Sequence, residues 1–227
     1  MRPGAVDVWF GVLRSDPSLY RDDYALLSDS ERAIADQRRT PEMRCRYAEI
    51  HAQKRRILAR YVNRRPQTIA IATGEYGKPY WVDHADWSFN LSHSGDCYII
   101  AVAKNCRLGI DIEQLKDRPN VAGLVAKCFA PTEIAYWQAL PEERRNGAFY
   151  RCWTRKEAFV KATGRGIVLG LDRCVTDPND PRRMLEVPDD YGPASLWHLV
   201  DLALPGELVG AVAVDREIET LQLRKIV

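Results

Sequence analysis

The chain has 227 residues, of which 46% are hydrophobic and 28% are charged, a composition typical of soluble globular proteins and unlike that of disordered or fibrous ones. A net charge of +2 is too small to indicate a nucleic-acid-binding protein by itself. No apolar run reaches the roughly 18 residues of a membrane helix, and no secretion signal is visible, so we expect a cytoplasmic protein without a membrane partner. The six cysteines match no metal-binding spacing and are expected to be free thiols: Cys45, Cys97, Cys106, Cys128, Cys152 and Cys174.

Apolar periodicity and turn residues predict helices and strands without regular alternation. In chain order, the first half has a strand at 5–13, a helix at 41–62, and strands at 68–73, 87–95 and 97–103. The second half has a strand at 107–113, helices at 121–129, 131–140 and 146–163, and strands at 195–202, 207–214 and 221–226. This order favours an α+β fold over a doubly wound sheet. The grouping of the strands predicts two lobes, residues 1–105 and 106–227.

The strand at residues 107–113 carries two acidic side chains on one face. Asp111 and Glu113 stand at positions i and i+2, and alternate side chains of a strand project to the same side. Ile110 and Ile112 project to the opposite side, as in a strand that faces a core. Such acidic pairs are also common on solvated strands, but within an apolar sheet they are costly unless they are paired or bound to a metal. The pair is therefore a candidate metal site.

The helix at residues 146–163 places Trp153, Glu157 and Lys161 on one stripe, because they are spaced by four residues. An ordinary surface Glu–Lys pair is the simpler alternative, but the aromatic neighbours indicate a buried helix. If Glu157 meets the two acidic residues of the preceding strand, three carboxylates repel one another. A hard cation such as Mg²⁺, which prefers oxygen ligands, would relieve that repulsion. A metal, carboxylates and a lysine together indicate phosphoryl chemistry.

Two turns carry polar residues that suit phosphate binding. Ser92 and His93 lie where a strand runs into a loop, and their side chains with nearby backbone N–H groups favour an anion. The loop lacks the nucleophile elbow of serine hydrolases, and a lone surface histidine is the alternative. Lys78 lies between Gly77 and Pro79, so a rigid turn presents its charge.

Residues 38–65 form a strongly basic segment with ten lysines and arginines and two acidic residues. Arg44, His51 and Arg55 lie on one face of the predicted helix. A solvated basic surface is the simplest interpretation. Contact with phosphates or with an acidic protein partner is the functional one.

Taken in order, these motifs resemble the 4′-phosphopantetheinyl transferases, of the broad-specificity type first known from activation of the surfactin synthetase. The segments that carry the resemblance are GKP at 77–79, NLSHSG at 90–95, GID at 109–111, FAPTE at 129–133 and WTRKEAFVK at 153–161. The resemblance implies a pseudo-dimer of two similar α/β lobes that binds coenzyme A and Mg²⁺ between them. It also implies transfer of phosphopantetheine from coenzyme A to a serine of an acidic apo carrier protein, with release of 3′,5′-ADP, by a monomer. The pathway implied is fatty-acid, polyketide or nonribosomal peptide biosynthesis.

The resemblance assigns roles by position. Asp111, Glu113 and Glu157 would hold the metal, and Glu157 would also accept the proton of the carrier serine. Lys161 would stabilise charge on the pyrophosphate and the leaving group. The implied contacts to coenzyme A are Lys78, Pro79, Ser92, His93, Asp111 and Lys161.

The chain departs from the family before the basic helix. Some members use lysines there to bind the 3′-phosphate of coenzyme A, and the nearest counterparts here are Glu31 and Ile34. We therefore assign this task to Arg44 or Arg46.

Two other functions remain open on sequence grounds. A metal-dependent phosphodiesterase or nuclease also uses Asp-x-Glu motifs, although Gln114 and Leu115 after Glu113 do not fit the Glu-x-Lys pattern of many nucleases. A non-enzymatic basic module that binds nucleic acid would use the basic helix, but it leaves the three carboxylates unexplained.

Overall fold

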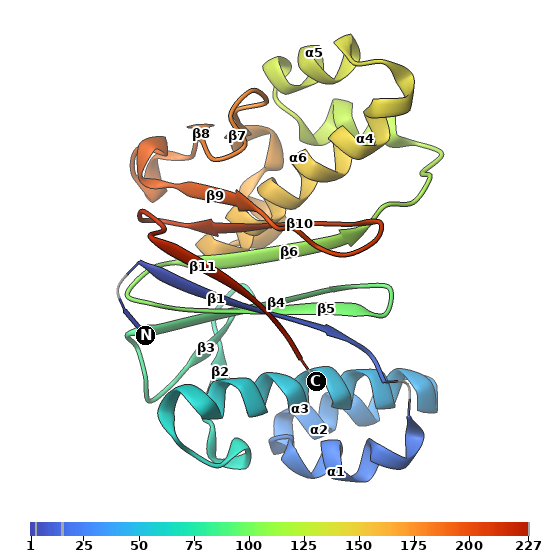
Figure 1. The fold of residues 1–227 in the computed structure, drawn as a ribbon, viewed down its shortest axis with the longest axis vertical. Coiled ribbons are helices and arrows are strands. Elements are labelled where there is room, and N and C mark those ends of the chain that lie inside the picture. Colours follow the sequence, from blue (N-terminus) through green and yellow to red (C-terminus); the bar gives the residue numbers. More distant parts are fainter. Residues whose placement is uncertain (3, 15, 227) are drawn as a thin grey trace.

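The structure is a computed structural model that describes residues 1–2, 4–14 and 16–226. It is an α+β fold, as predicted, with two sheets in the middle and helices at both ends (Figure 1). The helices are α1 (Tyr20–Leu26), α2 (Asp29–Asp36), α3 (Pro41–Val62), α4 (Val121–Cys128), α5 (Pro131–Ala139) and α6 (Glu142–Thr163). The strands are β1 (Ala5–Val12), β2 (Ile71–Thr73), β3 (Pro79–Trp81), β4 (Trp87–Ser94), β5 (Cys97–Lys104), β6 (Leu108–Gln114), β7 (Val175–Thr176), β8 (Met184–Glu186), β9 (His198–Asp201), β10 (Leu208–Val214) and β11 (Thr220–Lys225).

The first sheet has the order β11-β1-β5-β4 and is covered by α3. β5 runs antiparallel to both neighbours, with Ala101 opposite Val8 in β1 and opposite Asn90 in β4. Ile57 and Leu58 of α3 pack with the strands in one buried cluster. This apolar face anchors the long helix, so its polar residues are directed to the other sides.

The second sheet has the order β6-β10-β9, and α6 packs against it. Asp111 of β6 lies opposite Ala211 of β10 in an antiparallel register. A separate core fills the space between the two sheets and includes Val8, Ile110 and Val212, none of them exposed. The molecule is thus layered as helix, sheet, sheet and helix, and β4 and β6 are edge strands of the two sheets (Figure 1).

The predicted elements agree with the structure except at a few ends and in five omissions. The helix at 41–62 is α3, whereas the helix predicted from residue 146 begins earlier, at Glu142. Five short elements were not predicted, namely α1, α2, β3, β7 and β8. Of these, α2 is stabilised by a capping box between Ser28 and Glu31. The similarity of the two lobes and the division at residue 105 stay predictions.

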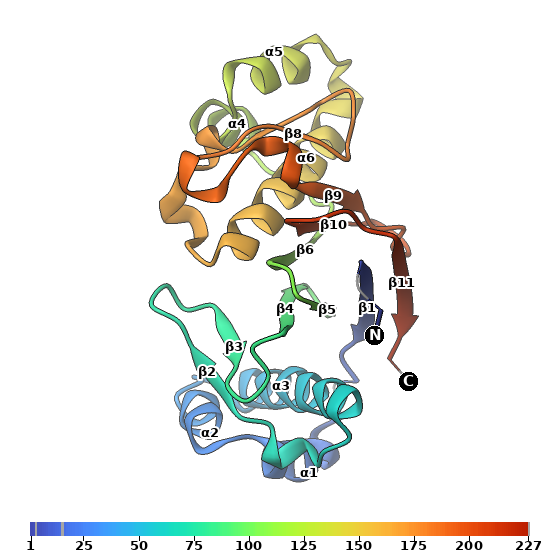
Figure 2. The same ribbon diagram turned by 90° about the vertical axis from the view of Figure 1, so that its left-hand side faces the viewer.

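The last strand crosses between the two halves. β11 follows the strands of the second sheet in the chain but pairs in parallel with β1 of the first sheet (Figure 2). A strand of alternating pattern can pair with any free edge, so its sequence gives no indication of this partner. The six cysteines are free, as expected. Within the described residues no helix is long and apolar enough to cross a bilayer.

Candidate functional site

The side chains singled out in the sequence meet in a cavity of about 390 Å³ where β4, β6 and α6 adjoin. Asp111 and Glu113 come from β6, and Glu157 comes from α6. The complete lining comprises Leu91, Ser92, His93, Asp111, Ile112, Glu113, Trp153, Glu157, Lys161 and Ile167. Three segments far apart in the sequence therefore form one acidic pocket with a single lysine.

A glycine brings the helix to the strand. A Cβ atom on Gly109 would lie 2.0 Å from the carbonyl oxygen of Ala158 and 2.4 Å from the backbone nitrogen of Ala162. Only glycine allows α6 to approach β6 this closely. The close contact places Glu157 and Lys161 over Asp111, which explains why the acidic strand motif begins with glycine.

Asp111 is buried, and only one of its two carboxylate oxygens has hydrogen-bond partners among the described residues. Its Oδ1 atom accepts hydrogen bonds from Lys161 Nζ at 2.6 Å and from Ser92 Oγ at 2.8 Å, and Lys161 also donates to Ser92 at 2.9 Å. Its Oδ2 atom is buried without a hydrogen-bond partner among the described residues, and so is Oε1 of Glu157. Unpartnered buried carboxylate oxygens are costly, which indicates that they await a ligand.

The pocket raises the proton affinity of Glu157. Burial is the main cause, the Asp111 and Glu113 charges act in the same direction, and Lys161 opposes them. Together they raise the pKa of Glu157 to about 7. A carboxylate with this pKa can accept a proton near neutral pH and hold it.

The donor set fits a hard divalent cation. Three carboxylates face one lysine, so negative charge is in excess, and the two unpartnered oxygens belong to Asp111 and Glu157. Carboxylate oxygens are the ligands that Mg²⁺ prefers. The described residues contain no group of three acidic, histidine or cysteine side chains already assembled around one point, so the carboxylates share a pocket without being preassembled.

A second cavity, of about 170 Å³, adjoins the acidic pocket through His93. Arg38 and Arg46 line it together with His51, and Arg46 also bonds to Asp96 and to the carbonyl of Gly95. Partial desolvation and the charges of Lys161, Arg46 and Arg38 lower the pKa of His93. The region is therefore positively charged and suits a phosphate.

The sequence analysis assigned Arg44 or Arg46 to this task and missed Arg38. Arg44 lines neither cavity; its Nε atom donates to the carbonyl of Arg38. Arg38 lies in the irregular segment between α2 and α3, and its place depends on how that segment folds back. Composition alone could not distinguish it from its basic neighbours.

Lys78 has a different environment from the one expected. Its ammonium donates to the carbonyls of Leu108 at 2.9 Å and Ala162 at 2.8 Å, and burial lowers its pKa to about 8. The second carbonyl belongs to the last turn of α6, where positive charge is favourable. Lys78 and Pro79 line a third cavity, of about 220 Å³, but the ammonium ties the turn before β3 to β6 and α6.

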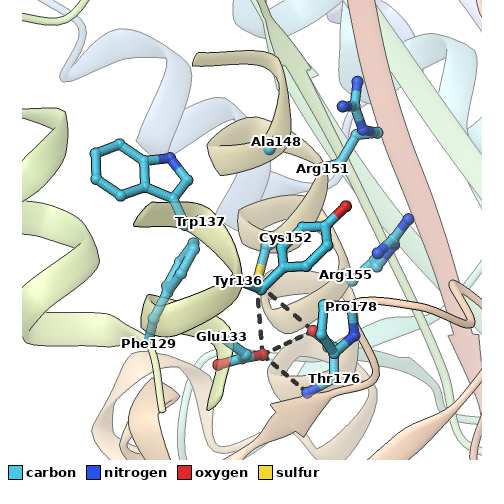
Figure 3. Close-up of a pocket in the computed structure, with 10 residues that line it drawn as sticks. All are labelled: Phe129, Glu133, Tyr136, Trp137, Ala148, Arg151, Cys152, Arg155, Thr176 and Pro178. Atoms are coloured by element: carbon cyan, nitrogen blue, oxygen red, sulfur yellow. Dashed lines mark hydrogen bonds between the residues drawn. The ribbon is translucent and has the colours of Figure 1, made fainter. Parts of the chain in front are cut away.

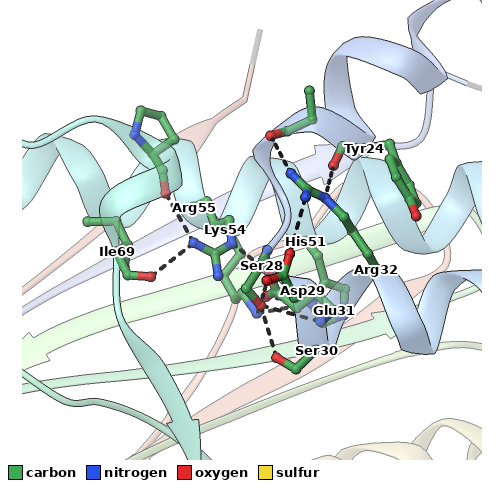
Figure 4. Close-up of polar contacts among 12 residues, drawn as sticks. Tyr24, Ser28, Asp29, Ser30, Glu31, Arg32, His51, Lys54, Arg55 and Ile69 are labelled. Carbon is green, nitrogen blue, oxygen red and sulfur yellow. Dashed lines mark hydrogen bonds and ion pairs between the residues drawn. The ribbon is translucent and has the colours of Figure 1, made fainter.

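The basic helix is partly neutralised by Glu31 (Figure 4). This carboxylate contacts Lys54 at 2.7 Å, Arg55 at 2.5 Å and His51 at 3.4 Å. Lys54 and Arg55 are 3% and 1% exposed, so neither forms a solvated basic surface. Burial alone would raise the pKa of Glu31, but its hydrogen bonds and the charge of Lys54 hold that pKa far below its usual value.

Glu133 forms a second neutralised cluster, behind α6, beside a cavity of only about 60 Å³ (Figure 3). It accepts from the backbone and hydroxyl of Thr176 and pairs with Lys156 at 2.6 Å. Lys156 is fully buried and also donates to two backbone carbonyls, those of Leu171 and Cys174. The lysine next to Glu157 in the sequence is therefore structural.

Comparison with known proteins agrees with this geometry. The sequence model of the 4′-phosphopantetheinyl transferase superfamily matches residues 107–213, which contain the three carboxylates and Lys161. A putative 4′-phosphopantetheinyl transferase of Synechocystis is 34% identical over 178 residues, 77% of this chain and 71% of that protein. The 4′-phosphopantetheinyl transferase HetI of Nostoc is 33% identical over 213 residues, 92% of this chain and 87% of that protein.

The 4′-phosphopantetheinyl transferase Sfp of Bacillus subtilis is 34% identical over 140 residues, 61% of each chain. The first two matches extend well beyond the acidic pocket, into both halves of the fold. The chain belongs to the 4′-phosphopantetheinyl transferase superfamily.

Proposed function

We propose that this chain transfers 4′-phosphopantetheine from coenzyme A to a serine of an apo carrier protein and releases 3′,5′-ADP. The observation that carries the proposal is the pocket in which Asp111, Glu113 and Glu157 converge around one lysine. A pyrophosphate is a substrate that needs charge neutralisation and accurate placement more than covalent help.

In this proposal the three carboxylates hold Mg²⁺. The unpartnered buried oxygens of Asp111 and Glu157 support this assignment. When bound, the cation neutralises charge on the pyrophosphate oxygens. Glu113 is half-buried near the end of β6 and completes the acidic side of the pocket.

Glu157 acts as the base in the proposed reaction. The carrier serine Oγ forms a bond to the β-phosphorus, the bond from that phosphorus to the bridging oxygen breaks, and the serine proton passes to Glu157. In the metal-free pocket its pKa is raised to about 7, so this carboxylate accepts a proton more readily than an ordinary glutamate does. Lys161 can stabilise the charge that develops on the leaving phosphate, because its ammonium lies on the same stripe of α6.

The positively charged cavity beside His93 is the proposed site of the 3′-phosphate. Arg38 and Arg46 line it, whereas Arg44 does not, so of the two arginines named from the sequence we retain Arg46 and add Arg38. Ser92 and His93 would contact the pyrophosphate, and Pro79 would line the nucleotide side. Lys78 would support that wall rather than touch phosphate.

The proposed partners are coenzyme A and acidic carrier proteins or domains, bound by a cytoplasmic monomer. A nucleic-acid-binding module is less compatible with the fold, because the buried pairs with Glu31 remove Lys54 and Arg55 from the surface. A nuclease remains an outcome of the test described next.

The test is the intact mass of several apo carrier domains after incubation with the protein, coenzyme A and Mg²⁺, with EDTA in a parallel sample. We expect a gain of one phosphopantetheine that EDTA abolishes. No gain on any carrier, together with no binding of coenzyme A, would contradict the proposal. Metal-dependent cleavage of DNA or RNA in a matched assay would favour the nuclease.

A further inference from the structure

The two sheets meet along a seam that is built from side chains. β4 and β6 are edge strands of different sheets, and no ladder of backbone hydrogen bonds joins them within the described residues. Instead, four alternate residues of β4 face β6, because alternate side chains of a strand share one face. These four residues are Ser88, Asn90, Ser92 and Ser94.

Each member of the seam has its own partner on or beside β6. Ser88 donates to the carbonyl of Cys106, and the Asn90 side-chain oxygen accepts from the N–H of Ile110 at 2.9 Å. These two bond only to backbone, so they align the strands. The two serines that follow bond to carboxylates, and they are where the seam enters the acidic pocket.

Ser94 has a hydrogen-bond geometry that fixes its proton. Its Oγ atom accepts from the backbone N–H of Gln114 at 3.1 Å and lies 2.7 Å from Oε2 of Glu113. A hydroxyl has one proton to donate. The N–H of Gln114 uses one lone pair of Ser94 Oγ, and the hydroxyl proton of Ser94 is donated to the Glu113 carboxylate.

Glu113 depends on this one contact more than Asp111 depends on either of its two. Ser94 is its only hydrogen-bond partner among the described residues, whereas Asp111 is held by both Ser92 and Lys161. A glutamate near the end of a strand has several rotatable bonds and would otherwise lose its place by the pocket.

We propose that Ser94 is a positioning residue that holds the Glu113 carboxylate beside Asp111, in the orientation needed for the divalent cation. The proposal rests on the proposed metal site. Groups that orient metal ligands typically change metal affinity by about 10–100-fold when they are removed. The expected effect is thus on the affinity for the metal rather than on the fold.

The experiment measures the dissociation constant of Mn²⁺ by electron paramagnetic resonance of the free ion, with the full chain and without coenzyme A. Ser94→Val and Ser94→Thr form a matched pair of similar shape, and only threonine keeps the hydroxyl. We expect Ser94→Val to weaken Mn²⁺ binding about tenfold and Ser94→Thr to restore affinity close to that of the wild type. Ser88→Ala, on the same face of β4, should leave Mn²⁺ affinity unchanged.

The variant Glu113→Gln distinguishes a failure of the proposed role of Ser94 from a failure of the proposed metal site. If Ser94 acts through Glu113, the loss caused by Ser94→Val should disappear in the Glu113→Gln background, because the effects of coupled residues are not additive. Weaker Mn²⁺ binding by Glu113→Gln, with wild-type binding by Ser94→Val, would overturn the role of Ser94 alone. Wild-type Mn²⁺ binding by both Glu113→Gln and Asp111→Ala would overturn the metal site and, with it, this inference.

Discussion

Two buried clusters of charged residues in this protein differ in whether their carboxylate oxygens are paired. In the cluster beneath α3, one carboxylate, that of Glu31, contacts Lys54, Arg55 and His51 (Figure 4). In the pocket at α6, three carboxylates share one ammonium, and two of their oxygens have no hydrogen-bond partner among the described residues. Cations surround the carboxylate in the first cluster, whereas carboxylates surround the cation in the second.

The difference distinguishes a structural cluster from a functional one. A buried charge that is fully paired gains nothing from a ligand, and removing one partner leaves an uncompensated charge. Buried carboxylates that outnumber their cations and keep unpaired oxygens are destabilising by themselves, and they gain from a bound cation. The cluster whose carboxylate is paired should therefore control stability, and the pocket with unpaired carboxylate oxygens should control activity.

Removing Asp111 should have the largest effect, and it should fall on activity. We expect Asp111→Ala to lower the transfer rate by about 10³-fold or more, because the proposed site loses a ligand and Lys161 loses its partner. The melting temperature should change little, because the substitution also removes repulsion within the pocket. The rate follows from a carrier mass assay and the melting from circular dichroism; near-normal transfer would contradict the metal assignment.

Removing the charge of Glu31 should have the opposite profile. We expect Glu31→Gln to lower the free energy of unfolding by about 3–5 kcal/mol, the usual cost of breaking a buried ion pair. Transfer at saturating coenzyme A should remain close to normal when it is assayed well below the melting temperature. A chemical denaturation series measures the first quantity, and an unchanged midpoint would contradict this account.

The stabilisation by Glu31 should also depend on pH in a defined direction. Its pKa is lowered in the folded state from the ordinary 4.5, so its contribution is complete above that pH and declines as the pH falls below it. The difference in unfolding free energy between wild type and Glu31→Gln should therefore shrink below about pH 4.5. A difference that stays constant down to pH 3 would rule out this charge as its origin.

Gly109→Ala should disturb the acidic pocket at α6 indirectly. The new Cβ would meet backbone atoms of Ala158 and Ala162, which cannot rotate away, so α6 must shift from β6. We expect a loss of about 1–3 kcal/mol of stability, typical of overpacking, and weaker Mn²⁺ binding as Glu157 moves from Asp111. Gly147→Ala, on α6 itself and near only the flexible Arg151 side chain, is the control.

Lys78→Met should produce the smallest effect and tests whether this lysine is structural. Methionine keeps much of the apolar stem but loses the ammonium that bonds the carbonyls of Leu108 and Ala162. We expect a loss of about 1–2 kcal/mol in stability and a higher KM for coenzyme A, with kcat almost unchanged. A loss confined to kcat would instead place Lys78 at the reacting phosphates.

Sequence reasoning succeeded where the periodicity of one element decided the outcome. Strand alternation predicts that Asp111 and Glu113 share one face, and helix spacing predicts that Glu157 and Lys161 share one stripe. All four side chains line the pocket. These predictions needed no knowledge of neighbours. The same applies to α3, whose first-turn Pro41 marked its start correctly.

The rest depended on contacts between distant segments. The role of Gly109 requires knowing that α6 lies on β6, and that of Lys78 requires the carbonyls of Leu108 and Ala162. The neutralisation of Arg55 by Glu31 depends on α2 packing beside α3. Such pairs have no local signal, so a charged residue in the sequence does not reveal whether it is balanced in the fold.

The acidic pocket at α6 should bind one divalent cation. Titrating Mn²⁺ into the wild type and into Asp111→Ala, with the free ion measured by electron paramagnetic resonance, shows whether it does. We expect one bound Mn²⁺ per wild-type chain, displaced by Mg²⁺, and binding at least about tenfold weaker in Asp111→Ala. Equal binding by both proteins, or no binding by the wild type, would contradict this expectation.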